Sequence, residues 1–182
     1  MHNTVEQGVE VPDIVILEGC DGSGKTALAN QLRDELGYHI VKTGPPAPGE
    51  STFKSYTTAL LEAVEVAVYN NHRTVFDRHY LGETIYGPLL RGRDTLGIHG
   101  RDLIEALIVV CEAVVVICAP PWEVLVKGWS GKDDLLKYES QLRAVNDAYL
   151  VEAARLGLEV YDWTSSNGRL PRSLFQEATI DE

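Results

Sequence analysis

The chain has 182 residues and a formal net charge of −11, a length that suits one α/β domain. Its hydrophobic fraction of 45% excludes disordered, fibrous and low-complexity proteins. No apolar stretch reaches the ~20 residues of a membrane span, and residues 1–10 resemble neither a secretory signal nor a transit peptide, so we expect a cytoplasmic protein without a membrane partner.

Apolar runs and helical periodicities alternate along the chain. Short runs of branched and aromatic residues predict strands over residues 13–17, 38–42, 73–76, 113–118 and 158–163. Apolar positions three or four residues apart predict helices over residues 25–36, 53–69, 101–112, 122–127 and 133–156. This order predicts one α/β domain over residues 1–182, with a parallel sheet covered on both faces and peripheral ends at 1–10 and 166–182.

Two segments between these elements predict loops. Residues 43–49 contain three prolines, which disfavour both an α-helix and the hydrogen bonding of a β-strand to its neighbours. The segment from Gly82 to Gly100 also contains Gly87, Gly92 and Gly97. Its composition suits either a flexible flap over a bound acceptor or a plain surface loop.

A phosphate-binding pattern follows the first predicted strand. It consists of Gly19, Cys20, Asp21, Gly22, Ser23, Gly24, Lys25 and Thr26, with two glycines five apart before Lys and Thr. Glycines let the backbone amides face phosphate groups, and the following helix adds its positive N-terminus. We predict that this loop binds ATP, with Lys25 on the β- and γ-phosphates and the Thr26 hydroxyl on Mg²⁺.

Asp77, Arg78, His79 and Tyr80 follow the third predicted strand. Asp77 can hold Mg²⁺ or accept a proton from an acceptor hydroxyl, and Arg78 can clamp an anion. The alternative for this pair is a surface ion pair. His79 can hydrogen-bond a substrate or pack against the strand, and Tyr86 can stack on a nucleobase.

Residues 72–101 hold five arginines against three carboxylates in an otherwise acidic chain. The arginines are Arg73, Arg78, Arg91, Arg93 and Arg101. This excess predicts either an anion-binding segment or an ordinary solvated surface.

The segments from Glu18 to Thr26 and from Asp77 to Tyr80 resemble the paired motifs of the thymidylate kinase family and its deoxynucleoside kinase relatives. The stretch from Asp77 to Asp94 is also similar to phage-type thymidylate kinase-like proteins, some of which phosphorylate hydroxymethylated bases in DNA. The resemblance implies a P-loop kinase fold with a five-stranded parallel sheet and a small lid at about residues 127–133. It also implies ATP and Mg²⁺ as cofactors and Lys25, Asp77 and Arg78 as catalytic residues.

The chain departs from the family at the arginines expected on the transferred and acceptor phosphates. Lys42 begins the sequence Lys-Thr-Gly-Pro-Pro where the family has Arg-Glu-Pro, and the lid offers only Lys127 and Lys132. Lys42, Arg91, Arg93 and Lys132 are candidate replacements, although lysine gives a point charge where arginine grips two oxygens. A hydroxyl acceptor would require Asp77 as the base, or less favourably Glu18 or Asp21.

The leading hypothesis is therefore an ATP-dependent kinase for a pyrimidine deoxynucleotide-type acceptor, most simply thymidylate. The candidate acceptor-binding residues are Lys42, Arg78, His79, Tyr86, Arg91 and Arg93. One alternative is a DNA kinase that phosphorylates 5-hydroxymethyluracil or a strand end, with residues 73–101 as a basic groove. Another is a regulatory ATPase module, and the choice between monomer and homodimer stays open.

Overall fold

A computed structural model describes residues 9–44, 50–129 and 135–177. Its centre is a parallel five-stranded sheet in the order β3-β4-β2-β5-β6. The strands are β2 (Ile14–Glu18), β3 (His39–Lys42), β4 (Thr74–Asp77), β5 (Val114–Cys118) and β6 (Glu159–Tyr161). All five predicted strands are confirmed, each within two residues at either end.

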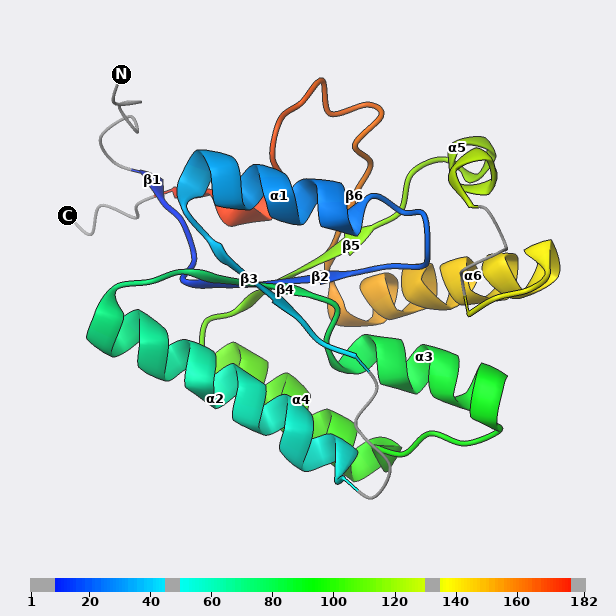
Figure 1. Ribbon diagram of the computed structural model, residues 1–182, viewed down its shortest axis with the longest axis horizontal. Helices are drawn as coiled ribbons and strands as arrows, with labels where there is room; N and C mark the ends of the chain where they lie inside the picture. Colours follow the sequence, from blue (N-terminus) through cyan, green and yellow to red (C-terminus); the bar gives the residue numbers. More distant parts are fainter. Residues whose placement is uncertain (1–8, 45–49, 130–134, 178–182) are drawn as a thin grey trace.

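Helices cover both faces of this sheet (Figure 1). They are α1 (Lys25–Leu36), α2 (Thr52–Asn70), α3 (Tyr80–Arg91), α4 (Gly97–Val110), α5 (Trp122–Gly128) and α6 (Glu139–Leu156). Side chains alternate along β2, so Val15 and Leu17 join the core under α1, while Ile14 and Ile16 join the core under α2, α4 and α6. These two apolar layers fix the strand ends that carry the site.

The expectation of a flexible flap or loop over residues 82–100 is wrong, because most of the segment is helical. Helix α3 starts three residues after β4 and buries Tyr80, Leu81 and Tyr86. Gly87 belongs to this packing, since a Cβ there would lie 2.8 Å from the carbonyl oxygen of Arg93. The glycine therefore serves close packing within a helix, and its presence does not indicate mobility.

Helix α6 begins later than predicted, and α4 begins four residues earlier. Leu135 and Tyr138 are 61% and 68% exposed and precede α6, while residues 133–134 lie outside the described residues. The side chain of Gln141 accepts hydrogen bonds from the amides of Lys137 and Tyr138, which caps the helix at Tyr138. The apolar residues spaced seven apart thus include one, Leu135, that precedes the helix and is exposed.

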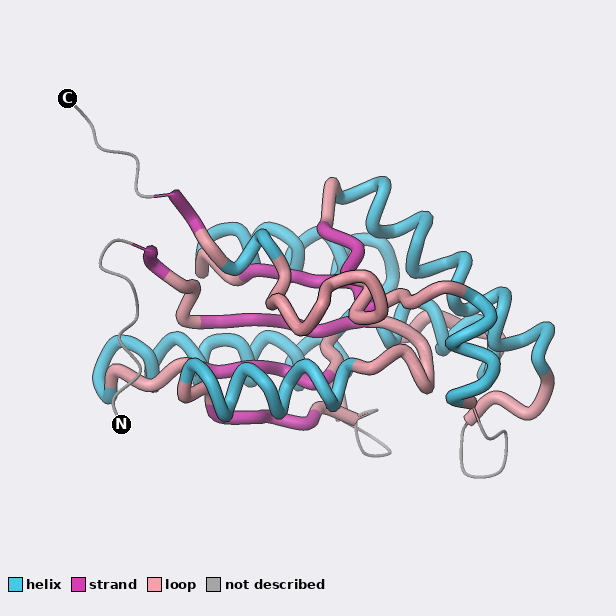
Figure 2. Tube along the Cα trace, turned by 90° about the horizontal axis from the view of Figure 1, so that it is seen from above, coloured by secondary structure: helices cyan, strands magenta, loops and turns pink. Residues whose placement is uncertain are grey.

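A small antiparallel pair joins the two ends of the described chain. Strands β1 (Val9–Glu10) and β7 (Gln176–Glu177) lie at the end of the molecule where β2 begins (Figure 2). Before β7, the 3₁₀ helix η1 (Arg172–Leu174) places the fully buried Leu174 in the core under α1. Residues after 165, expected to be peripheral, therefore contribute to that core.

The carboxyl ends of the parallel strands meet at one edge of the sheet. The loop after β2 and the turn after β4 lie there side by side, because these two strands are neighbours. Open parallel sheets bind ligands at this edge. Within the described ranges, no helix is long and apolar enough to cross a membrane.

Candidate active site

The phosphate loop connects β2 to α1 and contains three glycines with positive φ, two of which also leave no room for a Cβ. Gly19 has φ +142°, and a Cβ there would lie 2.4 Å from the carbonyl oxygen of Cys118 on β5. Gly24 has φ +94°, and a Cβ there would lie 2.8 Å from the indole of Trp163. Both positions therefore require glycine, and the loop closes tightly against β5 and the chain after β6.

Lys25 is the first residue of α1, and its side chain folds back into the loop. Its Nζ donates hydrogen bonds to the Cys20 carbonyl oxygen at 2.6 Å and to Ser23 Oγ at 3.2 Å. Burial, helped by the nearby charge of Arg78, lowers the pKa of Lys25 to about 8. The loop thus holds an ammonium group that a polyphosphate would stabilise.

Thr26 and Asp77 join the start of α1 to the end of β4. Thr26 Oγ1 donates a hydrogen bond to Asp77 Oδ2 at 2.8 Å. The two side chains border a pocket of about 360 Å³ lined by residues 21–27, Asp77 and Arg78. We name this the donor pocket. A hydroxyl beside a carboxylate gives the oxygen ligands that Mg²⁺ prefers.

Arg78 leaves β4 in a left-handed conformation, with φ +78°. This conformation is costly for a non-glycine residue and is a mark of functional sites. Its guanidinium pairs with Asp21 Oδ1 and lies 5.1 Å from the ring centre of Tyr86. The Tyr86 hydroxyl in turn accepts a hydrogen bond from the Asp21 amide at 3.2 Å. Arg78 is therefore fixed between the phosphate loop and α3.

Glu18 is fully buried at the end of β2 and holds the start of α3. Its Oε1 accepts hydrogen bonds from the amides of His79 at 2.9 Å and Leu81 at 3.0 Å, and its Oε2 accepts one from the Tyr149 hydroxyl at 3.2 Å. Burial raises the pKa of this carboxyl group. Because both oxygens are engaged in the fold, Glu18 is poorly suited to the role of base.

A second pocket, of about 300 Å³, lies beside the donor pocket. Its lining residues are Asp21, Thr43, Gly44, Tyr56, Arg78, His79, Gly82, Glu83, Tyr86, Arg91 and Leu135. We name this the acceptor pocket. Arg91 Nη2 pairs with the buried Glu83 carboxylate at 2.5 Å, and Thr95 Oγ1 donates to the same carboxylate at 2.6 Å. Asp21 and Arg78 line both pockets.

His79 packs into the protein at the back of the acceptor pocket. The residue is 1% exposed, and its ring centre lies 5.0 Å from that of Tyr56 and 5.2 Å from that of Phe76. Its Nε2 donates to the Tyr56 carbonyl oxygen at 3.2 Å, and burial lowers its pKa to about 4. His79 packs against the strand and is neutral at pH 7, and its buried Nδ1 has no hydrogen-bond partner among the described residues.

Several residues expected at the acceptor lie elsewhere. Lys42 and Arg93 are exposed and do not line the acceptor pocket. Lys127 is exposed in the last turn of α5. Lys132 lies outside the described residues, as does most of the proposed lid at 127–133. Of the arginine candidates, only Arg78 and Arg91 reach the pocket.

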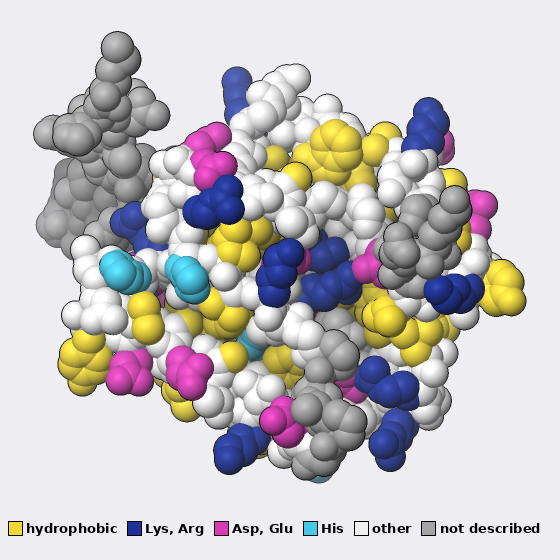
Figure 3. Space-filling model, viewed as in Figure 1, with side chains coloured by type: hydrophobic (Ala, Val, Ile, Leu, Met, Phe, Trp, Pro, Cys, Tyr) yellow, Lys and Arg dark blue, Asp and Glu magenta, His cyan; other side chains and the backbone are white. Residues whose placement is uncertain are grey.

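The predicted basic groove over residues 73–101 does not form. Arg73 precedes β4, at the opposite end of that strand from Arg78, and contacts the Leu36 carbonyl oxygen at 3.4 Å. Arg101 pairs with Glu105 and Glu152. On the face drawn in Figure 3, Lys and Arg side chains form separate small groups among acidic ones. Helical geometry and ion pairing disperse the charges that sequence proximity suggested.

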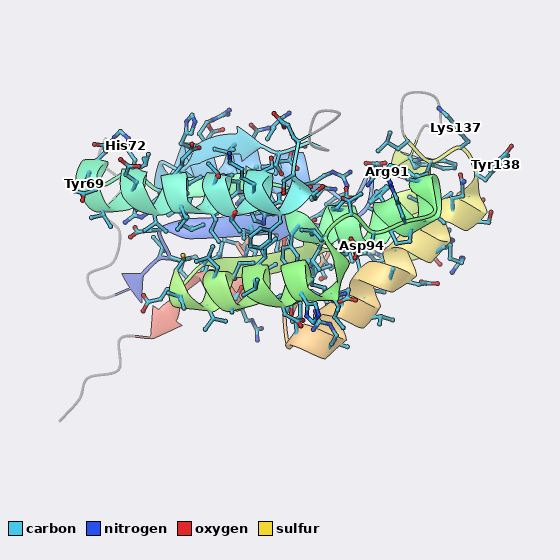
Figure 4. All side chains as sticks on the ribbon, turned by 90° about the horizontal axis from the view of Figure 1, so that it is seen from below. Tyr69, His72, Arg91, Asp94, Lys137 and Tyr138 are labelled. Atoms are coloured by element: carbon cyan, nitrogen blue, oxygen red, sulfur yellow. The ribbon has the colours of Figure 1, made fainter. Side chains whose placement is uncertain are left out.

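Sequence reasoning missed Glu83 as a residue of this pocket. Tyr56 on α2 is 5% exposed, and it also lines the acceptor pocket. Glu83 and Arg91 lie eight residues apart in α3, beyond the three- or four-residue spacing that pairs side chains on a helix, so no local spacing signals this ion pair. Figure 4 shows Arg91 at the end of the molecule opposite Tyr69.

Neither a protein-family model nor a curated protein matches this chain. Among solved structures, it is similar to YorR protein from Bacillus subtilis in complex with phosphorylated GDP, with 24% identity, a TM-score of 0.58, and coverage of 82% of this chain and 84% of that chain. Deoxyadenosine kinase from M. mycoides with bound dCTP matches at 17% identity and a TM-score of 0.48, over 81% of this chain and 89% of that chain. The likeness to YorR, together with the sheet order, confirms the predicted P-loop kinase fold.

Proposed function

We propose that the protein is a phosphotransferase that moves the γ-phosphoryl group of ATP to a nucleotide-type acceptor. One observation carries this proposal. The donor and acceptor pockets adjoin, and Asp21 and Arg78 line both. A group that leaves a donor in the phosphate loop would therefore meet the acceptor beside the Arg78 guanidinium, where developing charge is stabilised.

On the donor side, the residues fit a Mg²⁺-bound triphosphate. Lys25 supplies a buried ammonium, and the pocket of about 360 Å³ over the glycine loop leaves room for phosphate groups. Thr26 and Asp77 would hold Mg²⁺, directly or through water, since their oxygens already lie 2.8 Å apart. When bound, the ion offsets charge on the phosphates during transfer.

On the acceptor side, the pocket suits one nucleoside-sized ligand. Its volume of about 300 Å³ lies at the lower end of the range for small-molecule sites. The rings of Tyr56 and Tyr86 offer apolar contact to a base. The Glu83 and Arg91 pair presents a hydrogen-bond acceptor beside a donor, the arrangement found along the edge of a pyrimidine. The tyrosines and the Glu83 and Arg91 pair support binding of a base, and the small volume favours a pyrimidine over a purine.

A second candidate is an acceptor that reacts through a hydroxyl group and carries no phosphate. The charges of the acceptor pocket speak for this candidate. Each arginine is offset by a carboxylate, Arg78 by Asp21 and Arg91 by Glu83. A monophosphate would have to displace one of these carboxylates, whereas a hydroxyl on a nucleoside or a hydroxymethylated DNA base would not. For this reaction we assign the base role to Asp21, because its Oδ2 is buried with no partner among the described residues.

Asp77 is less suited to that proton transfer. It lines only the donor pocket and already accepts the Thr26 hydroxyl. We therefore keep Asp77 with the metal. The adjoining acceptor pocket also argues against a regulatory ATPase that transfers nothing.

The test is transfer of label from γ-labelled ATP with Mg²⁺ to four acceptors. These are free deoxynucleosides, their monophosphates, plain DNA and DNA containing hydroxymethyluracil. Lys25→Ala serves as the blank, and Lys54→Ala, an exposed lysine on α2, is the matched control. Label on thymidylate supports the leading acceptor, and label on a nucleoside or on modified DNA alone supports the hydroxyl acceptor.

Arg78→Ala separates the two sides of the site. We expect it to raise the KM for the acceptor more than the KM for ATP, because the guanidinium lines the acceptor pocket. An absence of label on every acceptor would refute the phosphotransferase. An unchanged acceptor KM in Arg78→Ala would remove Arg78 from the site.

A further inference from the structure

Trp163 follows β6 by two residues and lies against the phosphate loop. A Cβ on Gly24 would be 2.8 Å from both Cδ1 and Nε1 of the indole, so the pyrrole edge of the ring faces the loop. Gly24 is the N-cap of α1 and lines the donor pocket. Nevertheless, 45% of Trp163 is exposed. Trp163 thus presents a large flat side chain, only partly covered by the fold, next to a residue that lines the donor pocket.

The loop that carries Trp163 is ordered by a local turn and joined to α1 by one hydrogen bond. The Thr164 amide and hydroxyl donate to Asp162 Oδ1 at 2.9 and 2.7 Å. Further along, Gln31 Nε2 on α1 donates to the Gly168 carbonyl oxygen at 2.9 Å. Figure 1 shows this loop, which follows β6, beside α1. Because α1 begins at the phosphate loop, the Gln31 bond joins the loop that carries Trp163 to the helix that Gly24 caps.

Sheet order places Trp163 on the side of the donor pocket away from the acceptor. The acceptor pocket is built after β4 and on α3, whereas β6 lies beyond β5 on the other side of β2. A triphosphate has its reacting phosphate at one end and its nucleoside at the other. With the γ-phosphate directed toward Arg78, the nucleoside leaves the loop on the opposite side, past Gly24.

We propose that Trp163 is the stacking platform for the base of the nucleoside triphosphate donor. This inference rests on the donor site of the proposed function and adds the residue that binds the donor base. An indole contacts the π face of a base, which every base has, and does not read its edge. Recognition through Trp163 is therefore tolerant of base identity, and ATP and GTP gain equally from it.

The test compares ligands with and without a base. Binding of ATP, GTP and inorganic tripolyphosphate, each with Mg²⁺, is measured by calorimetry for the wild type, Trp163→Ala and Trp163→Phe. Tyr69→Ala is the matched control, since Tyr69 is a 79% exposed aromatic residue near the end of α2. Thermal unfolding of each variant checks that it is folded.

We expect Trp163→Ala to weaken ATP and GTP binding by about 5- to 150-fold, the usual loss for one base-stacking aromatic residue, and to leave tripolyphosphate binding unchanged. Trp163→Phe retains most of the affinity, because it keeps an aromatic face. An equal loss for tripolyphosphate would overturn the inference and make Trp163 a support for Gly24 alone. A loss confined to ATP or to GTP would overturn it in favour of an edge contact. Failure of the wild type to bind any of the three ligands would instead refute the donor site itself.

Discussion

Lys25 holds its ammonium group inside the phosphate loop at a cost to folding. The residue is 5% exposed, and burial together with the charge of Arg78 lowers its pKa from 10.5 to about 8. Each pKa unit corresponds to about 1.4 kcal/mol. Keeping Lys25 charged in the folded protein at pH 7 therefore costs about 3 kcal/mol of stability.

Lys25→Met removes this charge and keeps an unbranched side chain. It also removes the hydrogen bonds from Nζ to the Cys20 carbonyl oxygen at 2.6 Å and to Ser23 Oγ at 3.2 Å. Their loss costs about 1–2 kcal/mol. At pH 7 we expect the free energy of unfolding of Lys25→Met to exceed that of the wild type by about 1–2 kcal/mol, while label transfer from ATP is abolished.

The pH dependence distinguishes this explanation from a simple packing effect. Because the pKa of Lys25 is lower in the folded state, the unfolded protein binds more protons between about pH 8 and 10.5, so wild-type stability rises with pH across that window. The cost of the buried charge falls from about 3 kcal/mol at pH 7 to about 1 kcal/mol at pH 9.5. The advantage of Lys25→Met should therefore disappear by pH 9.5.

Urea unfolding of the wild type and Lys25→Met at both pH values measures these differences. Lys54→Met, at an exposed position on α2, is the control and should differ little from the wild type. If Lys25→Met is less stable than the wild type at pH 7, or if the difference does not depend on pH, the reasoning is refuted.

Three further variants test the site. Burial lowers the pKa of His79 to about 4, so the unfolded protein binds more protons than the folded protein as the pH falls below 6.5. The free energy of unfolding of the wild type should therefore fall by about 2 kcal/mol between pH 7 and 5 because of this group. Urea unfolding of His79→Gln should show a smaller fall, and an equal fall would contradict the assignment. Gly24→Ala should cost about 1–3 kcal/mol in thermal unfolding, because φ is +94° and the new Cβ meets Trp163 at 2.8 Å. Combining it with Trp163→Ala should recover part of that cost, and no recovery would contradict the contact. Asp77→Asn should slow transfer by about 10- to 100-fold and raise the Mg²⁺ concentration needed, because Asp77 orients the Thr26 hydroxyl; an unchanged Mg²⁺ dependence would exclude Asp77 from the metal site.

The parts of this protein that sequence alone predicted are those determined by local chemistry. Helix α1 spans the predicted residues 25–36 because its leucines recur on one face and Gly37, with φ +76°, ends it. The phosphate loop was predictable for the same reason, since its glycines are required by backbone conformation within a single turn. Segments with ambiguous local signals failed. Glycines in residues 82–100 indicated mobility, yet Gly87 serves close packing in α3.

Tertiary structure decided which distant side chains meet. Glu18 caps α3 from 61 and 63 residues away in the chain, through the amides of His79 and Leu81, and no periodicity of either segment signals that contact. The packing of Trp163 on Gly24 likewise depends on the sheet order, which brings the chain after β6 to the start of α1. Periodicity reports the face that a residue occupies within its own element, whereas the partner across the interface depends on how the strands are ordered. Arg78 and Arg91 were predicted at the acceptor from the sequence, whereas their pairing with Asp21 and Glu83 in one pocket depends on such contacts and appeared only in the folded protein.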